Sequence, residues 1–337
     1  MKFLQNIVRA LAGVAIAATS AGALTSCDSA IYDDLDPCDE GVVLRFVYDY
    51  NMEYANAFPA KVDCLTLHIY DSEGRFVETR TELSRAMLSD ESYRMRLDLP
   101  AGTYRMVAYG GMECDAASFA YTNAAPAAAA TLTDLSVTLP LADDATSSTL
   151  LHPLYYGAID VTVEPDKMGE TTLPMMKDTN NLRIVLQHLS GSPVDGRDFD
   201  FLITDDNTVL AHDNSVVKGN PVTYTPWTSG TASAGTDDSG ADVTVGYAEL
   251  STSRFVTSNS PRLIIRNRAT GANVVDIPLV NYLLLLKSDI YTEMGSQEFL
   301  DRQSEWSMVF FLTGDAQWYN VMIKINDWVV RLNDTEL

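Results

Sequence analysis

Hydrophobic and polar residues alternate in short runs from residue 41 onward, and turn residues separate one run from the next. Long stretches with a helical repeat are almost absent, a combination typical of antiparallel β-sheets. The expected strands cover residues 42–50, 65–70, 93–99, 103–109, 132–139, 156–163, 182–188, 199–203, 209–212, 243–250, 262–266, 274–278, 308–312 and 320–324. The pattern therefore predicts an all-β protein built from β-sandwiches.

A weak internal repeat divides the chain in two. Residues 65–77 and 199–210 each have the order strand, acidic turn, strand, and each follows a leading strand by about 20 residues. Duplication of one sandwich would give this repeat, so we expect an N-terminal β-sandwich over 41–170 and a C-terminal β-sandwich over 171–337, with the boundary near 168–172. The length of 337 residues agrees with two domains.

Several segments depart from the strand pattern. Residues 228–242 are rich in small and polar residues, which predicts a long flexible loop, and 124–131 predicts a shorter one. Short helices are expected at 83–88 and 295–303. Residues 277–286 form a strongly hydrophobic run that is too short to cross a bilayer. This run predicts a buried strand or a core helix, and a docking surface for a partner is the alternative.

The first 26 residues have the pattern of a bacterial lipoprotein signal peptide. Lys2 and Arg9 are followed by an apolar run over residues 10–23 and then by Leu24-Thr25-Ser26-Cys27. An apolar residue, two small residues and a cysteine resemble a lipobox, in which the cysteine thiol is diacylated before cleavage. We therefore expect Cys27 to be the lipidation site, and ordinary secretion with an incidental thiol is the alternative.

A lipid on Cys27 changes the expected relation of the protein to membranes. Two or three acyl chains, such as palmitate, hold a protein on a bilayer without any transmembrane helix. Residues 27–40 are short, polar and acidic, which suits a solvated tether. Acidic residues directly after the lipidated cysteine also resemble surface-export signals of some Gram-negative anaerobes. These features together predict a lipid-anchored protein that faces the cell surface.

Composition excludes one class of partner. Acidic residues number 46 against 23 basic ones, and the net charge is −23. Such a chain repels a phosphate backbone, so nucleic-acid binding is not expected. The acidic residues are scattered along the chain, which indicates a solvated exterior.

The residues that carry chemistry show no catalytic or metal-binding pattern. Three cysteines besides Cys27, namely Cys38, Cys64 and Cys114, allow at most one internal disulfide, and the sequence leaves the pair open. Their spacings fit no zinc site, and His68, His152, His188 and His212 share no ligand spacing. Motifs for serine hydrolases, nucleotide binding and zinc proteases are absent from the sequence. We expect no catalytic residue, no metal and no cofactor, and hence no enzyme.

Two sets of residues have a functional alternative. Carboxylate pairs could serve acid–base chemistry or calcium binding, although pairs arise by chance among 46 acidic residues: Asp198/Asp200, Asp205/Asp206 and Asp237/Asp238. The tryptophans could stack on sugar rings, although three of them lie among strand-like runs, where core anchors are the simpler interpretation: Trp227, Trp306, Trp318 and Trp328.

Several blocks of sequence, in the same order, resemble a known family over essentially the whole chain. The most specific is Gln297-Glu298-Phe299-Leu300-Asp301-Arg302-Gln303, followed by Phe310-Phe311-Leu312, Trp318 and Ile325-Asn326-Asp327-Trp328-Val329-Val330-Arg331. Residues 38–52, 99–104 and 180–184 are also similar. The chain thereby resembles the FimB-type fimbrial anchor (minor fimbrium anchoring subunit) lipoproteins of type V pili.

This resemblance implies a fold, a location and a partner. The fold would be two tandem transthyretin-like (Greek-key) β-sandwich domains, held on the outer membrane by acylated Cys27. The function would be to anchor a fimbrium, or pilus, and to help its assembly or length control. The partner would be a fimbrial shaft subunit joined by strand exchange, a process in which a cut behind an arginine removes an N-terminal strand. Arg45 lies in the first expected strand, and the sequence does not tell whether it is cleaved.

Two points stay open in this hypothesis. The chain could donate a strand, accept one or do both, and its end at residues 333–337 leaves little free strand to donate. The principal alternative function is a free-standing surface adhesin or glycan-binding lipoprotein of the same fold, suggested by the tryptophans and the expected loops. A lipid-anchored hydrolase is the weakest alternative.

Overall fold

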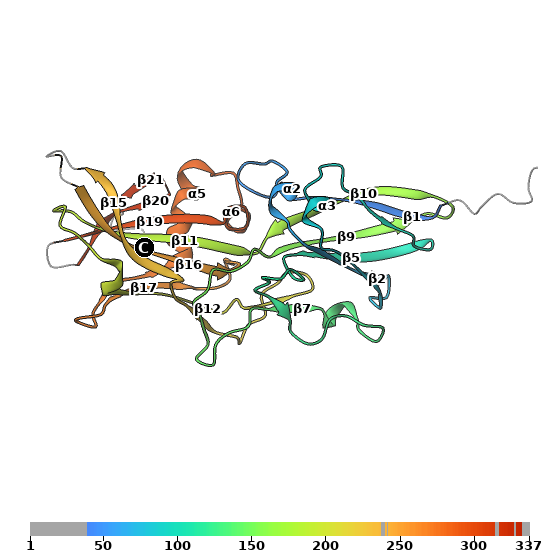
Figure 1. Ribbon diagram of the computed structural model, residues 1–337, viewed down its shortest axis with the longest axis horizontal. Coiled ribbons are helices and arrows are strands. Elements are labelled where there is room, and N and C mark those ends of the chain that lie inside the picture. The colour runs from blue at the N-terminus through green and yellow to red at the C-terminus, as the bar shows by residue number, and fades with distance from the viewer. Residues whose placement is uncertain (1–38, 237–239, 241, 314–316, 327, 332–337) are drawn as a thin grey trace, which may run out of the picture.

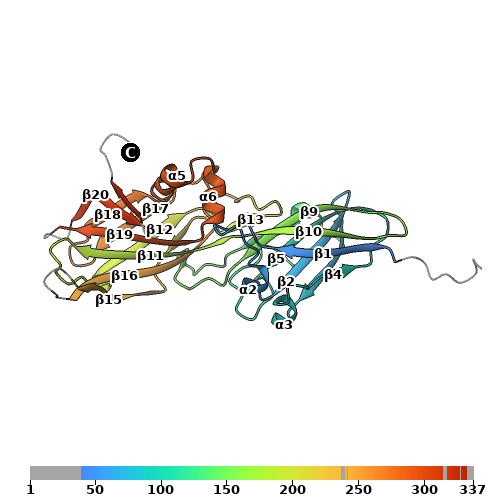
Figure 2. The ribbon, with the colours of Figure 1, turned by 90° about the horizontal axis from the view of Figure 1, so that it is seen from above.

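The computed structural model describes residues 39–236, 240, 242–313, 317–326 and 328–331 (Figure 1). Strands account for 47% of the described residues and helices for 11%, and the described strands form four sheets. The mostly β fold class is thus confirmed. The molecule is elongated, with an N-terminal and a C-terminal half arranged along its long axis (Figures 1 and 2).

A seven-stranded sheet dominates the N-terminal half. Its order is β3-β2-β5-β9-β10-β1-β4, formed by β1 (Gly41–Val47), β2 (Leu65–Asp71), β3 (Phe76–Glu82), β4 (Met95–Leu97), β5 (Gly102–Gly110), β9 (Tyr155–Val163) and β10 (Met168–Lys177). Strand β10 changes partner along its length: its first part pairs with β1 and its last part with β9. Leu44, Leu67 and Met106 belong to the core of this half, which α2 (Phe58–Lys61) and α3 (Arg85–Leu88) help to cover.

Two sheets form the C-terminal half. The six-stranded sheet has the order β15-β16-β11-β19-β20-β21, and the five-stranded sheet has the order β18-β17-β12-β14-β8. Their strands are β8 (Thr146–Ser147), β11 (Thr179–His188), β12 (Phe199–Asp205), β14 (Val222–Tyr224), β15 (Thr228–Thr236), β16 (Asp242–Ser253), β17 (Arg262–Asn267), β18 (Asn273–Pro278), β19 (Glu305–Leu312), β20 (Trp318–Ile325) and β21 (Trp328–Arg331). Inward-facing residues such as Leu182, Phe201 and Phe310 form one buried cluster.

Helices complete the core of the C-terminal half. They are α4 (Leu279–Leu283), α5 (Leu285–Ile290) and α6 (Ser296–Arg302). Leu279, Tyr282 and Leu283 of α4 are buried in the hydrophobic cluster. The run over 277–286 is therefore mainly a core helix, and the expected helix at 295–303 is confirmed. Among the described residues, none of the helices combines the length and the hydrophobicity needed to cross a membrane.

The two halves share strands and a core. A three-stranded sheet joins β6 (Ala120–Tyr121) and β7 (Ser136–Thr138) to β13 (Val209–Ala211) of the second half, and β8 pairs with β14. The short 3-10 helix η1 (Leu132–Asp134) precedes β7, and η2 (Gly196–Asp198) precedes β12 and lies against β15 and β16. One hydrophobic cluster contains residues of both halves, including Tyr109 and Phe310. The division into domains at residue 170 stays a prediction, and that residue lies inside β10.

The flexible loop expected over residues 228–242 is wrong for most of its length. Residues 228–236 form β15 and not a flexible loop, because they pair with β16 in antiparallel register. Their small residues have little strand propensity of their own, and the neighbouring strand supplies the backbone partners. The order strand, turn, strand is present in both copies of the repeat, as β2 and β3 and as β12 and β13. The pairing differs between the copies: β2 pairs with β3 as a hairpin, whereas β12 pairs with β14 and β17, and β13 pairs with β7.

Candidate functional site

The predicted lipidation site, Cys27, lies outside the described residues, and so does Cys38. The structure does describe the strand into which a tether from Cys27 would lead. This strand, β1, lies in the half of the molecule remote from β15 and β20 (Figure 2). Its packing therefore decides how firmly a lipid anchor would be attached to the fold.

Strand β1 is buried and has neighbours on both sides. Val42, Leu44 and Phe46 point into the core with 2%, 0% and 3% of their surface exposed, while Arg45 is exposed. Strand β10 pairs with β1 in parallel over the whole of β1, and β4 pairs with it in antiparallel fashion over 42–44. The peptide bond that follows Arg45 thus lies within a paired strand.

Polar contacts fix the start of β1. The Glu40 carboxylate accepts hydrogen bonds from the backbone N–H groups of Ala101 and Asp166. A Cβ atom on Gly41 would lie only 2.0 Å from the carbonyl oxygen of Leu97, so only glycine fits at this close approach. Glu40 and Gly41, at the start of the strand, are therefore held against neighbouring loops of the N-terminal half.

A buried carboxylate lies where the two halves meet. Strands β10 and β11 follow each other along the molecule (Figure 2), and Asp178 is the single residue between them. Asp178 is fully buried, and its Oδ1 accepts a hydrogen bond of 2.9 Å from Asn214 Nδ2. Burial raises the pKa of Asp178 to about 7, although Arg254, whose Nε is 3.9 Å from Oδ1, opposes the rise.

Arg254 joins this carboxylate to helix α6. Its guanidinium donates two hydrogen bonds to Asp301, at 2.8 and 2.9 Å, and one to the backbone carbonyl of Asn214 at 2.6 Å. Gln297 donates to the same Asp301 carboxylate at 2.8 Å. The bidentate pair fits the planar guanidinium. Four segments that are distant in sequence thus meet in one polar cluster, which we call the junction (Asp178, Asn214, Arg254, Gln297 and Asp301).

Helix α6 also contacts the N-terminal half. The guanidinium carbon of Arg302 lies 4.1 Å from the ring centre of Tyr50 and 4.5 Å from that of Tyr54. Its Nη1 donates to the carbonyls of Asp49 and Asn51, both at 3.3 Å. The block over 297–303 that carried the strongest family resemblance is therefore the segment that fastens the two halves together. Sequence reasoning had not given these residues a role.

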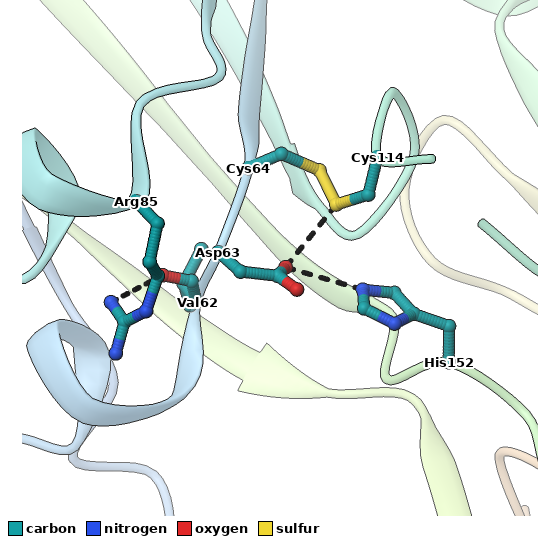
Figure 3. Close-up of a disulfide and its surroundings, with 6 residues drawn as sticks. All are labelled: Val62, Asp63, Cys64, Arg85, Cys114 and His152. Carbon is teal, nitrogen blue, oxygen red and sulfur yellow. Dashed lines mark hydrogen bonds and ion pairs between the residues drawn. A yellow bond between two sulfur atoms is a disulfide. The ribbon is translucent and has the colours of Figure 1, made fainter. Parts of the chain in front are cut away.

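The disulfide joins Cys64 and Cys114, which settles a pairing that the sequence left open (Figure 3). The Asp63 Oδ1 atom lies 3.2 Å from both Cys114 Sγ and His152 Nε2, and Arg85 donates to the carbonyl of Val62 at 3.1 Å. Asp63, Cys64 and Cys114 are close enough together to suggest a metal site. The sulfur atoms of Cys64 and Cys114 are bonded to each other, however, so these cysteines provide no thiolate ligand.

The other candidate residues have local structural roles. His68 is buried, and its two ring nitrogens lie 2.8 Å from Thr79 Oγ1 and 2.9 Å from the Tyr121 hydroxyl. Desolvation lowers the pKa of His68 to about 4. Asp200 pairs with Arg268, and Asp206 accepts hydrogen bonds from the backbone N–H groups of Gly219 and Asn220. The described candidates are thus not gathered into one site.

The four tryptophans have different environments. Trp306 is buried and donates to Asn180 Oδ1, so the core interpretation is confirmed for it. Trp318 packs edge-on against Phe310. Trp227 is 38% exposed. The side chain of Trp328 lies outside the described residues, as do Asp237 and Asp238.

Solved structures of surface proteins share this architecture. A candidate adhesin of Bacteroides thetaiotaomicron is 51% identical, with a TM-score of 0.84 over 89% of this chain and 100% of its own. A candidate polysaccharide-binding protein of the same species is 31% identical, with a TM-score of 0.75 over 87% and 98%. The fimbrial anchor protein Mfa2 of Porphyromonas gingivalis shares the fold at 15% identity, with a TM-score of 0.66 over 87% and 99%.

The class defined by these likenesses is that of bacterial adhesion and fimbrial proteins. The model of the fimbrillin-A associated anchor proteins Mfa1 and Mfa2 matches residues 35–334, so the chain belongs to this family of type V pilus anchors. No curated protein matches the chain. Members of the family associate with fimbrillin subunits at the cell surface and are not enzymes. The resemblance found in the sequence is confirmed.

Proposed function

We propose that this protein is a lipid-anchored outer-membrane subunit that fixes a fimbrium to the cell surface and helps its assembly or length control. The observation that carries the proposal is the family match over residues 35–334, which starts eight residues after Cys27 and reaches almost to the end of the chain. In this proposal, each half is a transthyretin-like β-sandwich, and acyl chains on Cys27 hold the N-terminal one at the membrane.

An anchor has to keep its first strand, and the packing of β1 supports this. A cut after Arg45 would leave the lipid on a peptide that is joined to the fold by noncovalent contacts alone. Because β1 pairs with β10 along its whole length, Arg45 and Phe46 included, a protease could reach that bond only after β1 had separated from the sheet. We therefore propose that Arg45 is not cleaved in the working anchor.

The arrangement of strands also suits a load-bearing link. A pull on the tether acts on the N-terminal end of β1, and a pull from the fimbrium acts on the C-terminal half. Strand β10 runs parallel to β1 and leads through Asp178 into β11. The β1–β10 hydrogen bonds are then loaded together and not one after another. The contacts of Arg302 with Asp49, Tyr50, Asn51 and Tyr54 help to hold the two halves together.

The shaft subunit would join by adding a strand to an open sheet edge, and β15 is the best candidate. It is nine residues long, which makes it the longest edge strand of the four described sheets. It contains neither charge nor proline, the two features that usually protect an edge. By contrast, edge strand β3 carries Glu78, Arg80 and Glu82. A partner strand on β15 would satisfy its outward backbone groups.

The test uses cells that make the fimbrium. The outer membrane is extracted with mild detergent, and proteins that stay bound to the chain without boiling in SDS are identified by mass spectrometry. We expect a ladder that contains a fimbrial shaft subunit. A clean monomer from fimbriated cells would contradict the anchor function.

The lipid is tested separately with Cys27→Ala. This variant should fold normally, because Cys27 precedes the first strand by 14 residues. We expect it to move from the membrane to the soluble or secreted fraction, with loss of the acyl mass on the N-terminal peptide. Cys64→Ala is unsuitable as a control because it breaks the disulfide, so Ser29→Ala serves instead. Full membrane retention of Cys27→Ala would argue against the lipid anchor.

A further inference from the structure

The outer face of the six-stranded sheet contains a groove of about 520 Å³ that the anchoring function does not use. Its floor is formed by outward-facing residues of three neighbouring strands, Asn181 and Arg183 of β11, Glu249 of β16 and Glu305 of β19. Trp227, just before β15, is also part of the lining. These residues come from distant parts of the sequence and are held in register by the sheet.

The rim of the groove is apolar and exposed. Trp227 is 38% exposed and Leu150 is 53% exposed, and both line the groove. Few large hydrophobic side chains are this exposed among the described residues, and two of them line this one groove. Such a cluster of exposed hydrophobic side chains is typical of a binding site. The Trp227 ring shows no aromatic stacking partner within the described part of the chain. A flat, amphipathic ring at the edge of a groove can pack against the C–H face of a sugar.

The floor supplies planar polar groups. Arg183 Nη1 lies 3.2 Å from Glu249 Oε1, and these side chains are 49% and 25% exposed. Its guanidinium carbon also lies 5.1 Å from the ring centre of Tyr247, which fixes its plane. Glu305, which accepts from Asn181 Nδ2 at 3.1 Å, is 64% exposed. Each of these groups keeps donors or acceptors toward solvent, and such bidentate groups match neighbouring hydroxyls.

The charges in the groove indicate which kind of ligand fits its apolar rim and polar floor. Arg183 and Lys324 bring positive charge to the groove, whereas Glu249 and Glu305 bring negative charge. The groove therefore has no excess of cations to bind an anion, and the net charge of −23 repels polyanions before contact. An apolar ligand would leave the floor groups desolvated without partners. A neutral, hydroxyl-rich ligand meets both requirements.

We propose that this groove binds a neutral glycan, with one sugar ring on Trp227 and Leu150 and its hydroxyls on Arg183, Glu249 and Glu305. The groove lies away from β1, and its lining includes Trp227 but no residue of β15. It is thus separate from both strands that the proposed anchoring uses. It would give the protein an adhesive function of its own at the cell surface. Of the tryptophans considered from the sequence as sugar platforms, Trp227 is then the one that acts as such.

The proposal is tested by affinity electrophoresis of the full chain in mild detergent. The native gels contain a neutral β-glucan, a neutral mannan, a neutral galactan or, as a polyanion, polygalacturonate. We expect at least one neutral polysaccharide to retard the wild type. Trp227→Ala should weaken that retardation at least tenfold, Leu150→Ser should weaken it several-fold, and Trp227→Phe, which keeps an aromatic face, should retain most of it.

A matched control is Leu189→Ala, because Leu189 is similarly exposed, at 51%, and does not line the groove. It should bind like the wild type. Thermal unfolding of every variant checks that the fold is intact, and Leu150→Ser keeps the test valid if Trp227→Ala does not fold. Retardation that is unchanged in Trp227→Ala and Leu150→Ser would overturn the proposal. So would retardation by polygalacturonate alone, or no retardation by any neutral polysaccharide.

Discussion

Strands β1 and β15 lie in opposite halves of the molecule and have opposite surroundings. Strand β1 has a neighbour on each side and buries Val42, Leu44 and Phe46. Strand β15 has a neighbour on one side, β16, and its last six residues are mostly exposed. Burial of each large apolar side chain contributes about 1.5–3 kcal/mol. The N-terminal half is thus closed around the strand that leads to the predicted lipid, while the C-terminal half leaves an edge open.

This difference separates two demands on an anchor. The connection to the membrane has to persist, which requires a buried strand that cannot exchange. The connection to another subunit has to form after folding, which requires unpaired backbone groups. Helix α6 connects the two ends, since its Asp301 accepts hydrogen bonds from Arg254 of the C-terminal half and its Arg302 donates to the carbonyl of Asn51 in the N-terminal half. The predictions below test this contrast.

The largest effect is expected in the core beneath β1. Leu44 is fully buried, so Leu44→Ala removes apolar contacts and leaves a cavity. Such substitutions cost about 2–5 kcal/mol. Thr231→Ala on β15, where the side chain is exposed, should change the free energy of unfolding by less than about 0.5 kcal/mol. Equilibrium unfolding in guanidinium chloride measures both changes.

Limited proteolysis sharpens the same comparison. In Leu44→Ala the peptide bond after Arg45 should be cut faster by trypsin, because β1 separates from the sheet more often. Thr231→Ala should not change the rate at that bond. A loss of less than about 1 kcal/mol in Leu44→Ala would show that β1 is not held by its core contacts.

Much of this architecture could be predicted from the sequence. Short apolar or alternating runs placed β5, β9, β12 and β17 within one or two residues of their observed bounds. Buried and partly exposed residues alternate in β12 and β17, whereas residues 106–110 of β5 are all buried. Strand β10 was missed, since Met168–Lys177 contains Gly169 and Pro174 and lacks a clear alternation. Its neighbours β1 and β9 make it a strand.

The junction could not be predicted in the same way. Asp178, Arg254 and Asp301 are far apart in sequence, and Arg254 and Asp301 alone are separated by 47 residues. No local periodicity connects them, and an isolated aspartate after a strand usually indicates a turn. The family resemblance did mark residues 297–303, but it gave no reason for their importance. Only the fold brings their partners within reach.

A second, smaller contrast concerns pH. His68 in the N-terminal half has a pKa lowered to about 4, and Asp178 at the junction has a pKa raised to about 7. Between these values the unfolded chain protonates His68 more than the folded chain does, so the His68 contribution to stability falls as the pH falls from 6.5 to 4. Asp178 is protonated more in the folded chain, so its contribution is lost as the pH rises from about 4 to 7.

Two variants separate these opposing contributions. Asp178→Asn removes the contribution of Asp178. Compared with the wild type, the free energy of unfolding of this variant should therefore rise from pH 5 to 6.5. His68→Gln removes the contribution of His68. Compared with the wild type, the free energy of unfolding of this variant should fall over the same pH range. Each difference should amount to about 1–2 kcal/mol over this window. Urea unfolding at several pH values measures them, and parallel curves for the wild type and Asp178→Asn would mean that Asp178 does not titrate there.

The smallest effect on stability, with a specific effect on assembly, is expected at the edge of β15. Thr231→Lys places a charge on an exposed position of this edge, so folding should change by less than about 0.5 kcal/mol. A lysine disfavours the approach of another strand, because its charge would be desolvated in the new ladder. The amount of shaft subunit co-extracted with the anchor should fall at least tenfold.

Thr81→Lys provides the matched control, since it makes the same substitution at an exposed position of β3, an edge that already carries charges. If both lysine variants retain the shaft subunit equally, the partner does not add its strand to β15; if both lose it, the two edges do not differ and charge alone governs assembly.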